Sequence, residues 1–390
     1  MNSRAMRAML IGFTALTGAA LILGQETAGR SGRGPGRGRG PAGPPLREYT
    51  IIEIPGIVAA GAKWELVWQG TATESEGGKD LPEGTKLHGG NADGIVGTKD
   101  GGILFAQEQT NQVRKLDRDG KVSIYIENTH GTGAVGIDAK GRILGVERTC
   151  TDPGLFLPPD YCEKIEPPAV AILHPNSQRK VLADKTPDGR SLGRLNDLVI
   201  DKRGGVYFNG GGTFYVDPNG KVTEIMGLDG NPLQSNGLQL SPDEKIFYAT
   251  NGGGLVAYDI NEDGTVKNGR KLITFENGGG DGSAIDSKGN IYVTANFRIE
   301  VVSPEGKLLG EIPCPRGPIS VAFSGPGKKT LYMVGTGALG SDGKEYTTPM
   351  APVTVQTKDG PVQGDLQVRA NAKTIYKLST LSEGFPGRAK

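Results

Sequence analysis

Short apolar runs that follow a turn recur along this chain. The six copies are Lys99–Ala106, Ala139–Val146, Lys202–Asn209, Pro242–Ala249, Ser287–Thr294 and Pro326–Met333. Their starts lie at positions 99, 139, 202, 242, 287 and 326, and repeats of about 40–50 residues rich in short strands are typical of propeller blades.

Each copy is followed by a second pair of alternating apolar runs around a tight turn. Asp-Gly, Asn-Gly and Glu-Gly turns occur in Lys115–Val122, Tyr215–Val222 and Val301–Leu308. Glycine adopts the positive φ that such hairpin turns require. Each repeat therefore predicts two hairpins, and six such four-stranded units must stack to bury both faces. The fold class that follows is all-β, a six-bladed β-propeller; a stacked β-sandwich with repeated turns is the alternative.

The propeller is expected over residues 49–390, with two insertions. The longer spacing after the second copy predicts an insertion near 149–168, and the sixth unit carries another at 337–372. Trp64–Trp68 alternates as a strand ahead of the first copy. We expect this strand to pair into the last blade, because that would remove an exposed sheet edge.

The chain begins with a different kind of sequence. Arg4 and Arg7 precede an apolar stretch, Ala8–Leu23, and this order predicts a secretory signal peptide over residues 1–24. A retained signal anchor is the alternative, although the run is short and glycine-rich for a membrane span. Residues 25–48, dominated by Gly, Arg and Pro, are expected to be a disordered linker. We therefore expect a periplasmic or secreted protein with no stable membrane insertion after signal removal.

The cysteines and the charge refine this picture. Cys150 and Cys162 bracket a Pro-rich excursion in the first insertion, where an exported protein would form a disulfide; two unpaired thiols are the alternative. Cys314 remains as a core thiol. The formal net charge is +1, part of the basic side lies in the linker, and no nucleic-acid partner is expected.

Several chemistries lack their motifs. The three histidines, His88, His130 and His174, form no His-Glu-x-x-His pattern, and neither a Gly-x-Ser-x-Gly elbow nor a Walker-type loop occurs. Any chemistry must therefore use carboxylates and amides, with or without a hard cation.

Small polar clusters precede four of the repeated strands. They contain Asp93, Asn196, Asn236 and Asp281, each followed at once by an apolar run. In a propeller this position is the start of the innermost strand, at the mouth of the tunnel, so the four side chains are expected to converge. Two carboxylates and two amide oxygens suit Ca²⁺, or Mg²⁺ or Mn²⁺ with retained water. Ordinary turn residues are the alternative reading of each cluster.

The runs Arg194–Asp201, Ser235–Asp243 and Asp281–Tyr292 resemble those of the gluconolactonase / senescence-marker-protein (regucalcin) family, also called SMP-30/gluconolactonase/LRE-like. The resemblance covers about residues 85–335. It implies one divalent cation, Ca²⁺ before Mg²⁺, Mn²⁺ or Zn²⁺, held by Asp93, Asn236 and Asp281. It further implies that Asn196 contacts the metal or the substrate and that Arg194 orients substrate oxygens.

Two positions depart from the family pattern. Asp93-Gly-Ile replaces the usual Glu-Gly-Pro, and Glu147-Arg148 replaces a frequent Glu-His pair. The first change weakens the case for Asp93 as a ligand. The second leaves Glu147 as a candidate substrate-binding residue and puts substrate specificity in doubt.

The function that the resemblance implies is hydrolysis of a sugar-type lactone. A cation would polarise the ester carbonyl and stabilise the oxyanion, while Asp281 would accept a proton from the attacking water. A non-catalytic binding module with a structural metal and a phosphotriesterase-like hydrolase are the alternatives.

Overall fold

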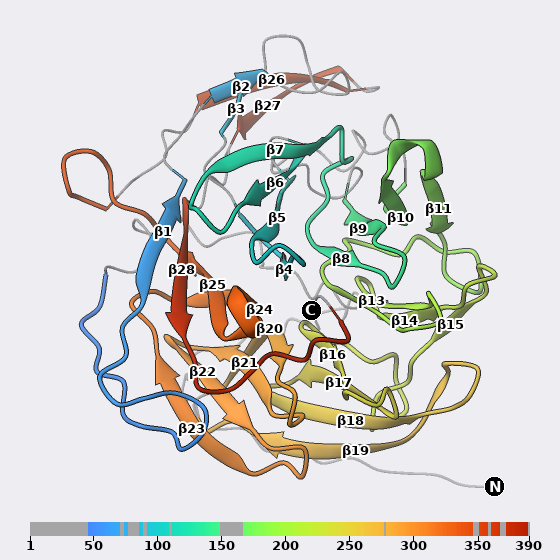
Figure 1. Cartoon of the computed structure of the whole chain (residues 1–390). Helices are drawn as coiled ribbons and strands as arrows, with labels where there is room; N and C mark the ends of the chain where they lie inside the picture. The colour runs from blue at the N-terminus through green and yellow to red at the C-terminus, as the bar shows by residue number, and fades with distance from the viewer. Residues whose placement is uncertain are drawn as a thin grey trace, which may run out of the picture. The chain divides into compact units, whose positions relative to one another are not determined.

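The structure is a computed structural model that describes residues 46–70, 74–76, 86–88, 92–108, 111–148, 167–276, 278–345, 351–357, 360–366 and 372–388. Six four-stranded antiparallel sheets surround a common centre (Figure 1). The helices among the described residues are short 3₁₀ turns, η3 (Asn176–Gln178) and η4 (Pro326–Lys328). The predicted six-bladed β-propeller is confirmed.

The blades follow one another along the chain, and the strands of each blade are ordered from the inside of the ring outward. Blade 1 contains β4 (Ile95–Gly97), β5 (Ile103–Gln107), β6 (Gln112–Leu116) and β7 (Val122–Glu127). Blade 2 contains β8 (Val135–Ile137), β9 (Ile143–Glu147), β10 (Ala169–His174) and β11 (Lys180–Ala183). Blade 3 contains β12 (Leu198–Ile200), β13 (Val206–Asn209), β14 (Thr213–Val216) and β15 (Val222–Glu224).

The second half of the ring repeats this order. Blade 4 contains β16 (Leu238–Leu240), β17 (Ile246–Asn251), β18 (Gly254–Ile260) and β19 (Val266–Thr274). Blade 5 contains β20 (Gly279–Ile285), β21 (Ile291–Ala295), β22 (Arg298–Val302) and β23 (Leu308–Pro313). Blade 6 contains β24 (Pro318–Ser324), β25 (Thr330–Thr336), β28 (Lys373–Ser379) and β1 (Glu65–Gln69). The repeated sequence phrase is therefore the turn into the second strand of each blade.

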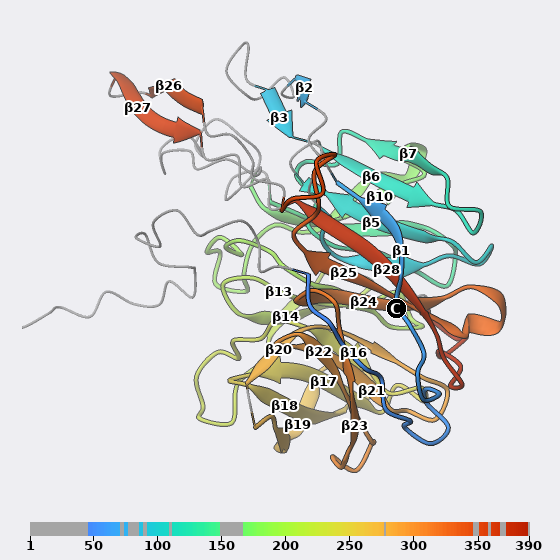
Figure 2. The same ribbon diagram turned by 90° about the vertical axis from the view of Figure 1, so that its left-hand side faces the viewer.

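The two ends of the propeller are joined in blade 6, as the sequence predicts. Strand β1 pairs antiparallel with β28, with Leu66 opposite Tyr376 (Figure 2). The buried Trp64 indole donates a hydrogen bond to the Pro313 carbonyl oxygen, with 3.0 Å between the atoms. An early segment thus supplies the outermost strand of the last blade and covers its edge.

The hydrophobic core lies between neighbouring blades. The Tyr207 ring of blade 3 stacks on Phe247 of blade 4, with ring centroids 4.8 Å apart and an 18° interplanar angle. Between blades 6 and 1, Tyr332 belongs to the same buried cluster as Ile95 and Phe105. Removal of these apolar faces from water is the main force that holds the ring together.

The insertions and the first residues of the chain lie largely outside this description. Residues 149–166, between β9 and β10, are not described, so the predicted Cys150–Cys162 disulfide lies outside the described residues. The second insertion contributes the hairpin of β26 (Ala351–Thr357) and β27 (Gly360–Leu366), and β2 (Glu74–Glu76) pairs with β3 (Lys86–His88). The predicted signal peptide and all but the last three residues of the predicted linker are likewise not described.

None of the helices among the described residues has the length and apolar character needed to cross a membrane. Cys314 is a buried free thiol, and burial raises its pKa well above the ordinary value.

The C-terminal segment lies at the end of the innermost strands that is opposite to their polar starts. The Arg388 guanidinium donates hydrogen bonds to the carbonyl oxygens of Leu240 and Ser241, at the end of β16. Asn236 lies just before the start of the same strand. The predicted site and the C-terminal anchor therefore occupy different ends of the ring.

Candidate functional site

The starts of the innermost strands of blades 3, 4 and 5 contact one another. Asn196 Nδ2 donates a hydrogen bond to Asn236 Oδ1, with 2.5 Å between the atoms. A Cβ atom added to Gly237 would lie 2.0 Å from the Asp281 carbonyl oxygen, so these backbones touch. The structure thus brings together three of the four residues that the sequence predicts to converge.

A buried asparagine that the sequence analysis missed holds two of these starts in place. Asn209, the last residue of β13, accepts a hydrogen bond from the Asp197 backbone N–H at 2.8 Å. Its Nδ2 donates to the carbonyl oxygens of Ser235, at 2.9 Å, and Asn236. The only sequence signal was a polar residue at the end of an otherwise apolar strand.

Arg148 lies just after β9, at the centre of a polar cluster. This cluster consists of Asp93, Glu108, Arg148, Asn196 and Asn236. The side chain of Arg148 is fully buried. Nη1 donates to Asp93 Oδ2 at 2.9 Å and to Glu108 Oε2. Nη2 donates to the Asn196 backbone oxygen at 3.1 Å and to Asn196 Oδ1 at 2.9 Å, and Nε donates to the Leu195 oxygen. These bonds use all five N–H donors of a guanidinium, and they connect Asp93 of blade 1 with Asn196 of blade 3.

The surroundings keep Arg148 charged. Burial by itself would lower the pKa of Arg148, but the attraction of the Glu108 and Asp93 carboxylates outweighs it and raises that pKa above its ordinary value. The neighbouring backbone also makes room for the side chain: a Cβ on Gly133 would lie 1.8 Å from Arg148 Cζ. Glycine at this position is therefore required by the guanidinium.

The two candidate substrate-binding residues Arg194 and Glu147 differ in environment. The Arg194 side chain is 41% exposed, and its Nη2 lies 3.4 Å from Glu108 Oε2, at the edge of the cluster. Glu147 is buried, and its Oε1 accepts a hydrogen bond from Arg179 Nη1 at 2.6 Å. Successive residues of a strand point to opposite sides, which explains why the Arg148 side chain enters the cluster whereas that of Glu147 points to Arg179. The substrate-binding role of Glu147 stays a prediction.

The predicted cation site can be tested against these contacts. Asp93 Oδ2 and Asn196 Oδ1 accept hydrogen bonds from Arg148, and Asn236 Oδ1 accepts one from Asn196. A divalent cation would need such oxygens as ligands and would lie beside the positive charge of Arg148. The described part of the chain contains no group of three or more His, Cys, Asp or Glu side chains that could hold a metal ion. The side chains of Asp93, Asn196 and Asn236, as they are arranged, do not fit a divalent cation.

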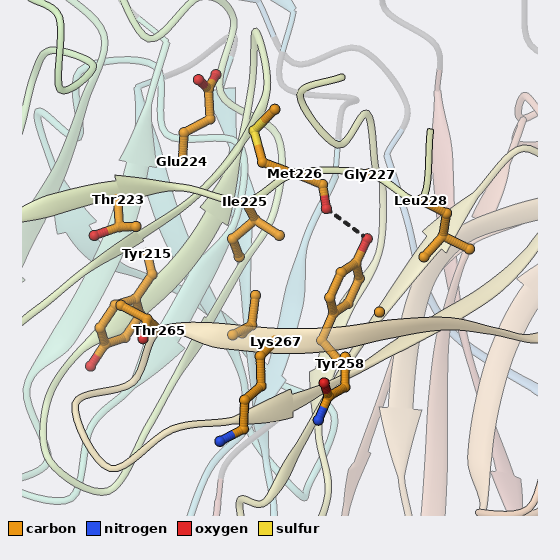
Figure 3. A pocket seen from close by; sticks show the side chains of 13 residues that line it. Tyr215, Thr223, Glu224, Ile225, Met226, Gly227, Leu228, Tyr258, Thr265 and Lys267 are labelled. Atoms are coloured by element: carbon orange, nitrogen blue, oxygen red, sulfur yellow. Dashed lines mark hydrogen bonds between the residues drawn. The ribbon is translucent and has the colours of Figure 1, made fainter. Parts of the chain in front are cut away.

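A separate cavity of about 470 Å³ lies between blades 3 and 4 (Figure 3). Its lining includes Tyr215, Met226, Leu228 and Tyr258, and the Tyr258 hydroxyl donates to the Met226 carbonyl oxygen at 3.0 Å. None of the residues predicted for catalysis, metal binding or substrate binding lines this cavity. The cavity is therefore distinct from the polar cluster.

Comparison with known proteins agrees with the fold. Residues 132–337 match the family described as SMP-30/Gluconolactonase/LRE-like region. The chain belongs to this family. The resemblance noted in the sequence is thus confirmed. Relatives of this chain are named as lactonases.

Two relatives illustrate the similarity in sequence. A 6-deoxy-6-sulfogluconolactonase of Pseudomonas putida is 34% identical over 250 residues, covering 59% of this chain and 78% of the relative. A gluconolactonase of Zymomonas mobilis is 27% identical over 278 residues, covering 62% of this chain and 75% of the relative.

Two solved structures are more distant and show the fold alone. A gluconolactonase from Xanthomonas campestris superposes with a TM-score of 0.59 at 17% identity, covering 87% of this chain and 98% of that chain. A calcium-binding protein, regucalcin, from Agrobacterium tumefaciens superposes with a TM-score of 0.50 at 14% identity, covering 80% and 95%.

Proposed function

We propose that this chain is a hydrolase that opens a sugar-type lactone at the mouth of the propeller tunnel. The observation that carries the proposal is the hydrogen-bonded chain from Asp93 through Arg148 and Asn196 to Asn236. It gathers polar side chains from four blades where the innermost strands begin. Its support from outside the structure is the relationship to lactonases of the same family.

The reaction is the attack of water on the ester carbonyl, followed by opening of the ring. Asp281 accepts the proton of the attacking water and passes it to the ring oxygen, which becomes a hydroxyl when the ester C–O bond breaks. The exposed guanidinium of Arg194 binds the carbonyl oxygen and the ring hydroxyls of the substrate, and its charge stabilises the developing oxyanion. The half-buried Asp281 and the exposed Arg194 are both open to solvent, as binding of a small molecule requires.

The predicted divalent cation, Ca²⁺ first among the candidates, would supply a Lewis acid for the carbonyl oxygen. No step of the reaction passes through it, because Arg148 and Asn196 engage oxygens of three of the four predicted ligands. The positive charge and the N–H donors of Arg194 stabilise the oxyanion instead.

The test is turnover of a panel of aldonolactones by the purified protein, followed as acid release above the spontaneous rate. Asp281→Asn should lower kcat/KM by about 10²–10⁴-fold through loss of the base, and Arg194→Gln should lower it by about 10²–10³-fold. Arg190→Gln is the matched control, because Arg190 pairs with Asp188 on the surface. Turnover of no lactone above the spontaneous rate would refute the proposal.

A further inference from the structure

We infer that the Arg148 guanidinium takes the place of a divalent cation at the tunnel mouth, and that the site works without a bound metal ion. The second half of this inference rests on the proposed lactonase function. The first half concerns binding alone and stands on the contacts of Arg148.

The guanidinium makes part of the connections that a bound cation would make, because it holds Asp93 and Asn196, two of the four predicted ligands. It lies between blades 1 and 3 and binds oxygen atoms of Asp93, Glu108 and Asn196, together with the Leu195 carbonyl oxygen. All of these partners are oxygens, the atom type that hard cations select. The five donors of the side chain are all used, so Arg148 organises the cluster and does not itself reach a substrate.

Two arginines face the carboxylates of Asp93 and Glu108, because Arg194 Nη2 also lies 3.4 Å from Glu108 Oε2. The carboxylates of Asp93 and Glu108 both contact the one buried positive charge of Arg148. A divalent cation on the same oxygens would lie within a few ångströms of that charge, where repulsion in a buried environment is strong. An arginine cannot relieve the repulsion by losing its proton.

The backbone around the side chain is also built for arginine. Gly133 leaves the space that Arg148 fills. Its N–H donates to the Val146 carbonyl oxygen at 3.0 Å, and its own carbonyl oxygen accepts from the Gly94 N–H at 3.0 Å. Gly133 is thus held between blades 1 and 2, and the space for the guanidinium is a fixed part of the structure.

The arrangement changes the role of Asn236. Because Arg148 holds Asn196 Oδ1, Asn196 Nδ2 is directed at Asn236 Oδ1. A side-chain amide offers two donors on its nitrogen, and Asn236 Nδ2 makes no hydrogen bond to a described residue. In place of a metal ligand, Asn236 becomes an N–H donor for the substrate oxyanion beside Arg194. Arg148 is then a positioning residue that acts through Asn196.

The experiment is calorimetric titration of the EDTA-treated protein with Ca²⁺, Mg²⁺, Mn²⁺ and Zn²⁺, with Asn236→Ala and Asp281→Ala titrated alongside. We expect that the parent protein binds no cation at a site that is lost in Asn236→Ala and Asp281→Ala. Lactone turnover should be equal within error in EDTA and in added Ca²⁺. One cation bound by the parent protein and lost from both variants would overturn the inference, as would loss of turnover in EDTA that Ca²⁺ restores.

A second measurement uses Arg148→Met, which removes the positive charge but leaves the oxygens of the cluster. Once circular dichroism shows that this variant is folded, it should gain saturable Ca²⁺ binding that is abolished by the further substitution Asp93→Ala. A folded Arg148→Met protein that binds no divalent cation would contradict replacement of an ion by the guanidinium. Absence of lactonase activity in every preparation would refute the proposed function instead, and the titrations would still decide the occupant of the site.

Discussion

Arg148 of blade 2 and Asp93 of blade 1 form a cross-blade ion pair, with 2.9 Å between Nη1 and Oδ2. The arginine is fully buried, whereas the Asp93 side chain is 29% exposed. The pair therefore joins the interior of the ring to the surface of the proposed site. Its two residues are connected by neither strand pairing nor proximity in sequence.

The first prediction concerns the stability of this cluster. Arg148→Met should lower the free energy of unfolding by about 3–5 kcal/mol, because it removes the buried positive charge that the buried Glu108 and the half-buried Asp93 carboxylates contact. Urea denaturation measures the change. The control is Arg190→Met, which removes a fully exposed pair with Asp188 and should leave the midpoint nearly unchanged. Equal changes in the free energy of unfolding for the two substitutions would contradict a stabilising role of the buried pair.

The second prediction concerns the contact between blades 4 and 5. Gly237→Ala places a Cβ atom 2.0 Å from the Asp281 carbonyl oxygen, so the two backbones must separate. We expect a loss of about 1–3 kcal/mol in stability and a larger proportional loss of lactone turnover, because Asn236 and Asp281 move apart.

The matched control for this contact is Gly317→Ala. The nearest atom to its added Cβ would be Thr336 Oγ1, at 3.1 Å, and that atom belongs to a side chain. Thermal unfolding and turnover of both variants give the comparison. A Gly237→Ala protein with the stability and activity of the Gly317→Ala protein would contradict the contact.

The third prediction tests the closure of the ring. Trp64→Ala should lower the free energy of unfolding by about 3–5 kcal/mol through loss of a large buried side chain and of its hydrogen bond to Pro313. Leu66→Ala, on the neighbouring strand β1, changes a side chain of a residue that is 47% exposed and should cost much less. Chemical denaturation of both variants provides the measurement; the reverse order would contradict a stabilising role of Trp64 in the closure.

The fourth prediction is a pH dependence. Burial, with a smaller contribution from Arg388, lowers the pKa of Lys328 from 10.5 to about 8. Between these values the unfolded chain binds more protons at this residue than the folded chain does. The contribution of Lys328 to the free energy of unfolding therefore rises as pH increases from about 8 towards 10.5. Below pH 8 the folded protein bears the full cost of burying the charged lysine.

Comparison with Lys328→Met isolates this contribution, since buried tyrosines such as Tyr292, whose pKa burial raises, titrate alike in both proteins. The free energy of unfolding of the parent minus that of the variant should increase across the interval from about pH 8 to about pH 10. The substitution also removes hydrogen bonds from Lys328 to the Phe385 and Arg388 carbonyl oxygens. A difference independent of pH would show that Lys328 titrates normally.

The fifth prediction concerns export. We propose that the mature chain begins near Gln25, lies in the periplasm or outside the cell, and has a disulfide between Cys150 and Cys162. Mass spectrometry of the native protein should show loss of the signal peptide. Thiol labelling after denaturation without reductant should modify Cys314 alone. An intact Met1 in cytoplasmic protein would contradict export, and labelling of all three cysteines would contradict the disulfide.

The sequence by itself determined the number of blades, their order and the strand that closes the ring. These features depend on local signals that repeat: alternation of apolar residues, and glycine where a hairpin turn needs positive φ. The clusters around Asn196, Asn236 and Asp281 were also readable, because topology places the start of every innermost strand at one end of the ring.

Only the tertiary structure decided what those residues contact. Glu147 and Arg148 are adjacent in sequence, and nothing in that adjacency tells which of them enters the cluster. The pairing of β9 with β10, which sets Glu147 opposite Ala169, directs the Glu147 carboxylate to Arg179 and Arg148 towards Asp93 and Asn196. Contacts of this kind depend on register and on the packing of separate blades, which bring together residues that no local pattern connects.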